Sequence, residues 1–103
     1  MNKHIFNDIL TLKRQILPND KVILFGSQAR GDARPDSDWD LLVLLNKQKK
    51  EFDDYGNFAY PFDEIGFSYG VAINPIIYTN EQWEKRKITP FYKNVMNDGI
   101  EIK

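Results

Sequence analysis

Apolar residues near the start of the chain recur with the spacing of one helix face. They stand at positions i, i+4, i+7 and i+11, and they are Ile5, Ile9, Leu12 and Ile16. This spacing predicts an amphipathic helix that packs on a sheet and ends at the Pro-Asn-Asp of residues 18–20. Lys13 and Arg14 are expected on its solvated outer face, because charged side chains are seldom buried.

Two apolar segments follow that have the composition of buried strands. Residues 21–25 and 38–45 are too apolar on both faces to be exposed, and the second is expected in the middle of a sheet. The side-chain period of two places Trp39 and the residues at 41, 43 and 45 on one face. Leu42 and Leu44 then face the other way, together with the two aspartates at the start of the segment.

The middle of the chain is rich in aromatic residues with helical spacing. The recurring positions are Phe52, Tyr55, Phe58, Phe62, Ile65 and Tyr69. Pro61 interrupts the pattern, which predicts a helix that begins at this proline and ends at Gly70. Residues 51–60 fit either a preceding helix or an ordered loop. The aromatic side chains are expected mainly in the core.

The last third of the chain predicts a strand, two helices and a short final strand. Residues 71–78 are rich in β-formers, and Pro75 makes this strand an edge strand or one with a bulge. Residues 79–82 fit a capping box that opens a helix. A second helix runs over residues 90–97, and residues 100–103 add a strand. The whole pattern predicts an α/β (α+β) fold, with a small mixed β-sheet and flanking helices in a single domain over residues 1–103.

Composition narrows the possible chemistry. The chain has 103 residues and no cysteine, which excludes disulfides and thiolate metal sites, and its single His4 disfavours a zinc site. No run approaches the roughly 20 apolar residues that span a bilayer, and no signal-peptide segment begins the chain, so a cytoplasmic protein is expected. The net charge is −1 without a sustained basic stripe, so nucleic acid is not an expected partner.

Two carboxylates and a glycine–serine corner carry the candidate chemistry. Asp38 and Asp40 are separated by one residue on a strand, so they point to the same face and repel each other unless they share a cation. Carboxylate oxygens of this kind suit Mg²⁺ or Mn²⁺ together with substrate phosphates. Gly26 lets the backbone approach a phosphate, and Ser27 offers a hydroxyl to it or simply caps the short helical turn of residues 27–31.

The combination of Gly26-Ser27, a ten-residue spacer and Asp38-x-Asp40, with Arg30 inside the turn, resembles the signature of the DNA polymerase β-like nucleotidyltransferase superfamily. The short chain is similar to its minimal branch, the antitoxin-like partners of HEPN-domain proteins. The resemblance implies a nucleotidyltransferase that binds ATP and Mg²⁺ (or Mn²⁺), with a HEPN-domain protein as partner. It also implies that Asp38 and Asp40 are metal ligands.

Active members of this superfamily usually carry a third acid on the strand that corresponds to residues 71–78. This strand has none, and Asn74 is the residue expected in that place. Its carbonyl oxygen binds metal weakly and is a poor general base, so weak or absent catalysis is expected. Asn74 is alternatively a polar residue beside a bulge. The acids Asp63 and Glu64 fall on the preceding helix, and nothing in the sequence brings them to the site.

The arginines of the turn also have alternatives. Arg30 binds phosphate oxygens or pairs with Asp32, Asp36 or a motif aspartate, whereas Arg34 is expected to be a solvated loop charge.

Two main functions follow, an enzyme and a binding module. The first transfers AMP from ATP to a protein side chain on the HEPN-type partner. The second is a nucleotidyltransferase fold without turnover that binds nucleotide or neutralises its partner by complex formation. A sugar-nucleotide site of the glycosyltransferase D-x-D type is a remote third option, because the chain is short for such enzymes and the Gly26-Ser27 corner would go unexplained.

Overall fold

The computed structural model describes residues 1–103 and contains a four-stranded mixed sheet with helices on both faces. The strands are β1 (Lys21–Phe25), β2 (Trp39–Leu45), β3 (Ile73–Thr79) and β4 (Ile100–Ile102), in the order β3-β2-β1-β4. β1 runs antiparallel to β2 and β4, whereas β2 and β3 are parallel. The predicted fold class is confirmed.

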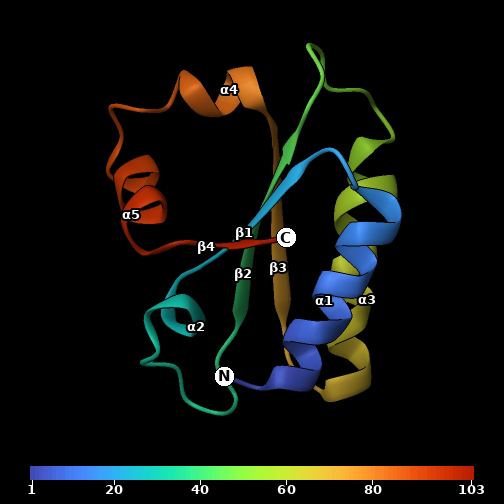
Figure 1. The fold of residues 1–103 in the computed structure, drawn as a ribbon, viewed down its shortest axis with the longest axis vertical. Coiled ribbons are helices and arrows are strands. Elements are labelled where there is room, and N and C mark those ends of the chain that lie inside the picture. Colours follow the sequence, from blue (N-terminus) through green and yellow to red (C-terminus); the bar gives the residue numbers. More distant parts are fainter.

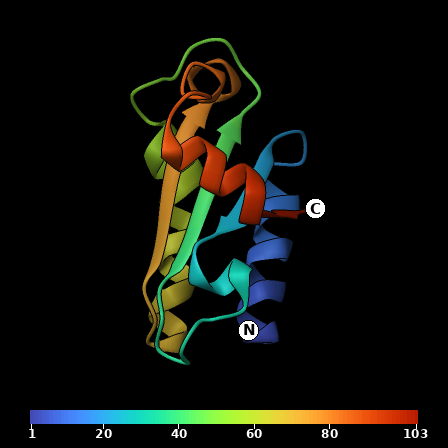
Figure 2. The ribbon, with the colours of Figure 1, turned by 90° about the vertical axis from the view of Figure 1, so that its left-hand side faces the viewer.

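The helices form two layers around this sheet. α1 (Lys3–Ile16) and α3 (Tyr60–Tyr69) lie side by side over one face, as Figure 1 shows. α2 (Ser27–Arg30) and α5 (Pro90–Asp98) lie over the other face, with α4 (Asn80–Glu84) at the end where β2 and β3 finish (Figure 2). None of these helices is long and apolar enough to cross a membrane.

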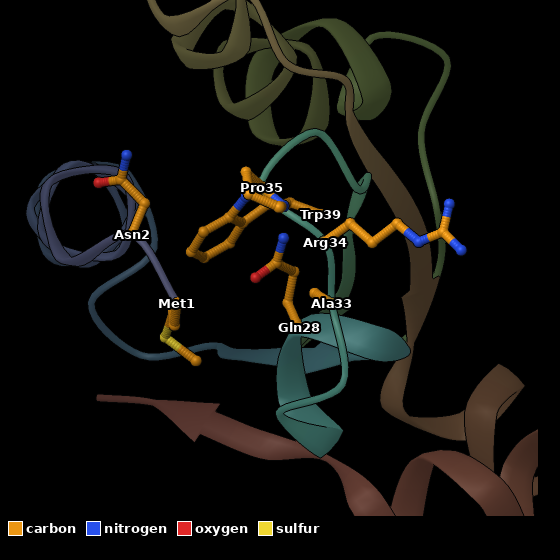
Figure 3. Close-up of a pocket in the computed structure, with 7 residues that line it drawn as sticks. All are labelled: Met1, Asn2, Gln28, Ala33, Arg34, Pro35 and Trp39. Carbon is orange, nitrogen blue, oxygen red and sulfur yellow. The ribbon is translucent and has the colours of Figure 1, made fainter.

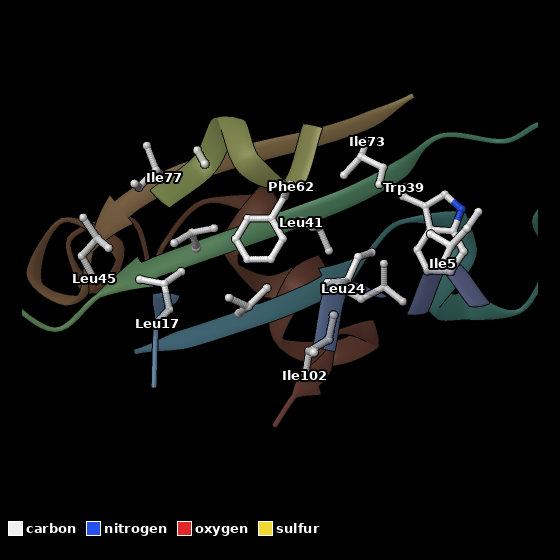
Figure 4. Close-up of a cluster of buried hydrophobic side chains, with 14 residues drawn as sticks. Ile5, Leu17, Leu24, Trp39, Leu41, Leu45, Phe62, Ile73, Ile77 and Ile102 are labelled. Atoms are coloured by element: carbon white, nitrogen blue, oxygen red, sulfur yellow. The ribbon is translucent and has the colours of Figure 1, made fainter. Parts of the chain in front are cut away.

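The central position of β2 follows from its sequence. Every residue of the strand except Asp40 is buried, and the predicted alternation divides its side chains between two separate cores. The larger core lies under α1 and α3 (Figure 4). Its buried members are Ile5, Ile9, Leu17, Val22, Leu24, Trp39, Leu41, Val43, Leu45, Ala59, Phe62, Ile73, Ile77 and Ile102. The smaller core joins Leu42 and Leu44 to Trp83 and Val95.

One charged residue of α1 is buried, although the sequence predicted it on the solvated face. Arg14 is exposed as predicted, but Lys13 is only 7% exposed, so the prediction of a solvated Lys13 was wrong. Lys13 follows Ile5 and Ile9 at four-residue intervals, which places its aliphatic stem on the helix face that meets the sheet.

The aromatic middle segment departs most from expectation. Residues Tyr55–Ala59 form a π-helix that continues into α3, which begins at Tyr60, one residue before Pro61. Phe62 is buried, but the aromatic rings of Phe52, Tyr55 and Tyr69 are exposed, so the prediction of a mainly buried set was wrong. A π turn adds a residue, so positions on either side of it do not share the face that a 3.6-residue period predicts.

The last third follows the prediction closely. Pro75 lies on β3, an edge strand, and Gly70 ends α3 with a left-handed backbone. The predicted capping box is present, because Thr79 Oγ1 accepts from the Gln82 N–H at 3.1 Å and Gln82 Oε1 accepts from the Thr79 N–H at 3.0 Å. The final strand, β4, pairs with β1.

Candidate functional site

Asp38, Asp40 and Asn74 meet where β2 and β3 begin. The parallel register sets Asp40 opposite Asn74, and Asp38 immediately precedes β2. The Asn74 amide nitrogen Nδ2 donates to Asp38 Oδ2 at 3.0 Å and to Asp40 Oδ1 at 3.3 Å. One donor thus bridges both carboxylates, so the two acids share a face as the strand period predicts.

Gly26 brings the end of β1 against the same carboxylates. β1 pairs with β2 so that Phe25 lies opposite Asp40, and Gly26 follows with φ +77° and ψ −157°, a conformation that L side chains rarely adopt. A Cβ atom at Gly26 would lie 2.5 Å from Asp40 Oδ2. Only glycine therefore allows the backbone to pass this close to the aspartate.

Ser27 is the first residue of α2 rather than its N-cap. Gly26 occupies the N-cap position, and no side-chain hydrogen bond caps the helix, so the predicted capping role of Ser27 was wrong. The positive φ of Gly26 starts the turn one residue early. The Ser27 carbonyl instead accepts the N–H of Gly31, which closes the helix with φ +80°. The Ser27 hydroxyl is left for another partner.

Arg30 pairs with one of the acids that the sequence offered. Its Nε lies 3.2 Å from Asp32 Oδ2, and both side chains are exposed. An exposed pair of this kind contributes little, so the guanidinium can exchange this partner for a phosphate at small cost. Arg30 also lines a cavity of about 230 Å³ together with Gly26, Asn94 and Phe91, so it borders the space next to the glycine corner.

A buried glutamine holds the loop that leads into Asp38. Gln28 on α2 donates from Nε2 to the Ser37 carbonyl at 3.2 Å. It borders a cavity of about 280 Å³ with Trp39, whereas the guanidinium of the exposed Arg34 extends away from both (Figure 3). We did not predict Gln28, because a single polar residue in a short turn gives no periodic signal.

Residues 7–100 match the nucleotidyltransferase domain family. The chain belongs to this family. The fold and the family were both predicted from the sequence, and both predictions are confirmed.

Curated relatives of this nucleotidyltransferase domain come from Methanocaldococcus jannaschii and are named as candidate protein adenylyltransferases. One, MJ0141, is 35% identical over 100 residues, which cover 97% of this chain and 93% of MJ0141. Another, MJ0604, is 35% identical over 82 residues, covering 77% and 73% of the two chains. A crystal structure of a toxin–antitoxin with AMP-PNP shares the fold, with a TM-score of 0.65 and 18% identity over all of this chain and 73% of that one.

The residues of the corner fit a divalent cation in part. The Asn74 N–H donor stands between two carboxylate oxygens, a position in which a cation would meet both. However, no cluster of three Asp, Glu, His or Cys residues is present, and Asp63 and Glu64 lie on α3, which packs against the opposite face of the sheet. The nucleotidyltransferase domain therefore offers two acids and one amide.

Proposed function

We propose that residues 1–103 act as a single nucleotidyltransferase domain that binds ATP with Mg²⁺ (or Mn²⁺) and transfers AMP to a side chain of a HEPN-type protein partner. Through this transfer the chain acts as an antitoxin. The observation that carries the proposal is the single Asn74 nitrogen that bridges Asp38 and Asp40 beside Gly26. The names of the M. jannaschii relatives support the reaction class, and the toxin–antitoxin structure supports a protein partner and a nucleotide.

Each residue of the corner has a distinct task. Asp38 and Asp40 would hold the cation, and a bound cation would supply positive charge against the triphosphate. Gly26 gives the phosphates access to the backbone, and the free Ser27 hydroxyl donates to a phosphate oxygen. Arg30 leaves Asp32 and binds phosphate oxygens. The chain thus supplies position and charge rather than a covalent intermediate.

Asn74 sets the limit on turnover. Rotation of its amide about the last side-chain bond replaces Nδ2 by Oδ1, so a neutral carbonyl oxygen can complete the cation site. In the reaction, the acceptor oxygen bonds to the α-phosphorus, the bond from the α-phosphorus to pyrophosphate breaks, and the acceptor proton passes to solvent water. An amide cannot take that proton as a carboxylate does. We therefore expect nucleotide binding to be retained and transfer to be slow.

The direct test uses ATP labelled at the α-phosphate, Mg²⁺ and a HEPN-domain protein. Label on the partner that disappears in the double variant Asp38→Ala, Asp40→Ala supports the enzyme. Asp36→Ala is the matched control, because Asp36 is an exposed acid of the same loop that makes no ion pair. Labelling that persists in the double variant would refute the assigned site.

The second candidate is a module that binds nucleotide and neutralises its partner by complex formation alone. The amide at position 74, where a third acid would stand, is the observation that favours it. If the wild type binds Mg-ATP without transferring label and Asn74→Asp begins to transfer, this reading replaces the first.

A further inference from the structure

The outer face of α3 carries two aromatic rings that the fold does not cover. Tyr60 and Phe67 are 42% and 65% exposed, and their ring centroids lie 6.5 Å apart in an edge-on arrangement across Glu64. We call these three residues the α3 face. Exposed aromatic residues concentrate in this part of the chain, since Phe52, Tyr55 and Tyr69 are exposed as well. Rings gathered on one helix surface are typical of protein–protein contacts.

Carboxylates border the α3 face. Residues 60–70 contain Asp63 and Glu64 and no lysine or arginine. A shallow, open groove of about 420 Å³ lies beside the face between α1 and α3, and Asp8 and Glu64 border it. The Tyr69 hydroxyl donates to Asp8 at 2.5 Å, whereas Glu64 is exposed and has no cation paired with it. The surface thus joins apolar rings to uncompensated carboxylates.

The aromatic rings and carboxylates of the α3 face favour one class of binding partner over the others. Nucleic acid and anionic membranes are repelled by the carboxylates, and so is the same face of a second copy. An extended peptide that adds to the sheet edge is disfavoured, because Pro75 on β3 has no N–H to offer it. A basic amphipathic helix satisfies both features, with aliphatic side chains on the rings and lysine or arginine side chains in the groove.

We propose that the α3 face and its groove are the docking surface for a basic amphipathic helix of the protein partner. This proposal rests on the proposed function for its link to transfer. α3 ends at Tyr69, with three residues between it and the start of β3 at Ile73, and the Trp39 N–H donates to the Ala72 carbonyl at 2.9 Å. The end of α3 therefore lies at the same end of the sheet as Asn74 (Figure 1), and a docked partner can reach the site around the β3 edge.

The test uses the ¹⁵N-labelled chain and two synthetic helices of about 18 residues. Both carry the same leucine face, but one has lysine and the other glutamate on its polar face. We expect the lysine helix alone to shift the amide signals of residues 60–69 and of α1 residues near Asp8. Phe67→Ala should weaken binding about tenfold, and Glu64→Gln several-fold with a smaller salt dependence.

Two control variants test whether binding is specific to the α3 face or is nonspecific. Ile88→Ala removes an apolar side chain that is 80% exposed beside Lys85 to Lys87, and Glu101→Gln removes an exposed acid on β4; neither should change the affinity. Equal binding of both helices, or signal shifts centred outside α3 and α1, would overturn the proposal. Mg-ATP titrations of the same variants keep the two proposals apart, because Phe67→Ala should leave nucleotide affinity unchanged.

Discussion

Gly26 is the residue on which the geometry of the corner depends most directly. Its backbone lies in a region open to glycine alone, and it leaves room for Asp40 on the neighbouring strand. Gly31 also has a positive φ, but a Cβ there would meet nothing within 4 Å. Comparing substitutions at the two glycines therefore distinguishes the effect of backbone strain, which both share, from the effect of a clash with the Asp40 carboxylate, which occurs only at Gly26.

Gly26→Ala is expected to lower the free energy of unfolding by about 2–4 kcal/mol, because strain and the Asp40 clash add. Gly31→Ala should cost only about 1–2 kcal/mol. Urea unfolding measures both, and a titration with Mg-ATP should show lost affinity for Gly26→Ala alone. Equal effects of the two substitutions on nucleotide affinity would argue against a role for Gly26 in the site.

Asn74→Asp tests the electrostatics of the acid pair. A third carboxylate would replace a donor that bonds to two acids, so without divalent cation the variant should be about 1–2 kcal/mol less stable than the wild type. Mg²⁺ should restore this loss, as thermal unfolding in EDTA and in Mg²⁺ would show. Asn97→Asp, an exposed asparagine on α5, is the control and should not respond to Mg²⁺. Insensitivity of the Asn74 variant to Mg²⁺ would contradict a shared cation position.

At the scale of elements, the connection from β2 to the π-helix is held by one buried carboxylate. Asp54 is 2% exposed, accepts from Lys47 Nζ at 2.7 Å and accepts from the Glu51 N–H at 2.6 Å. Burial raises the pKa of Asp54, but the Glu51 N–H and the Lys47 ammonium outweigh burial, so the pKa lies below its ordinary value of 3.8. The contact thus favours the charged carboxylate in the folded chain.

The depressed pKa gives a pH dependence with a definite sign. Its contribution to stability is complete above the unfolded value of 3.8 and is lost as the pH falls through the lower folded value. Asp54→Asn should therefore lower the urea midpoint at neutral pH, and the gap to the wild type should narrow in acid below that value. Asp53→Asn, at its exposed neighbour, is the control and should leave the urea midpoint at neutral pH unchanged. A gap independent of pH would contradict the ion pair.

Elements whose signals are local were predictable from the sequence. The capping box at Thr79, the edge position of the Pro75 strand and the alternation along β2 each follow from one physical rule. The π turn before α3 and the buried Lys13 did not follow, because both depend on how a helix meets the rest of the fold. The same distinction holds for the residues of the site. The shared face of Asp38 and Asp40 was predictable from the strand period, whereas the hydrogen bond from Gln28 to the Ser37 carbonyl was not.

At the scale of the whole molecule, the sheet gathers the candidate site at one end. The end of β1 and the starts of β2 and β3 meet there, although Gly26 and Asn74 are separated by nearly half of the chain. The proposed docking surface for a partner lies along α3, on the opposite face of the sheet. The β3 edge joins the two regions.

Paramagnetic broadening by Mn²⁺ in the presence of ATP, read from the amide signals of the ¹⁵N-labelled chain, shows whether a cation and a nucleotide meet at this corner. We expect selective broadening at Gly26, Ser27, Asp40 and Asn74, and its loss in the Asp38→Asn, Asp40→Asn double variant. Broadening that survives in that variant, or that centres on the Asp63 and Glu64 turn of α3, would contradict a cation–nucleotide site at this corner.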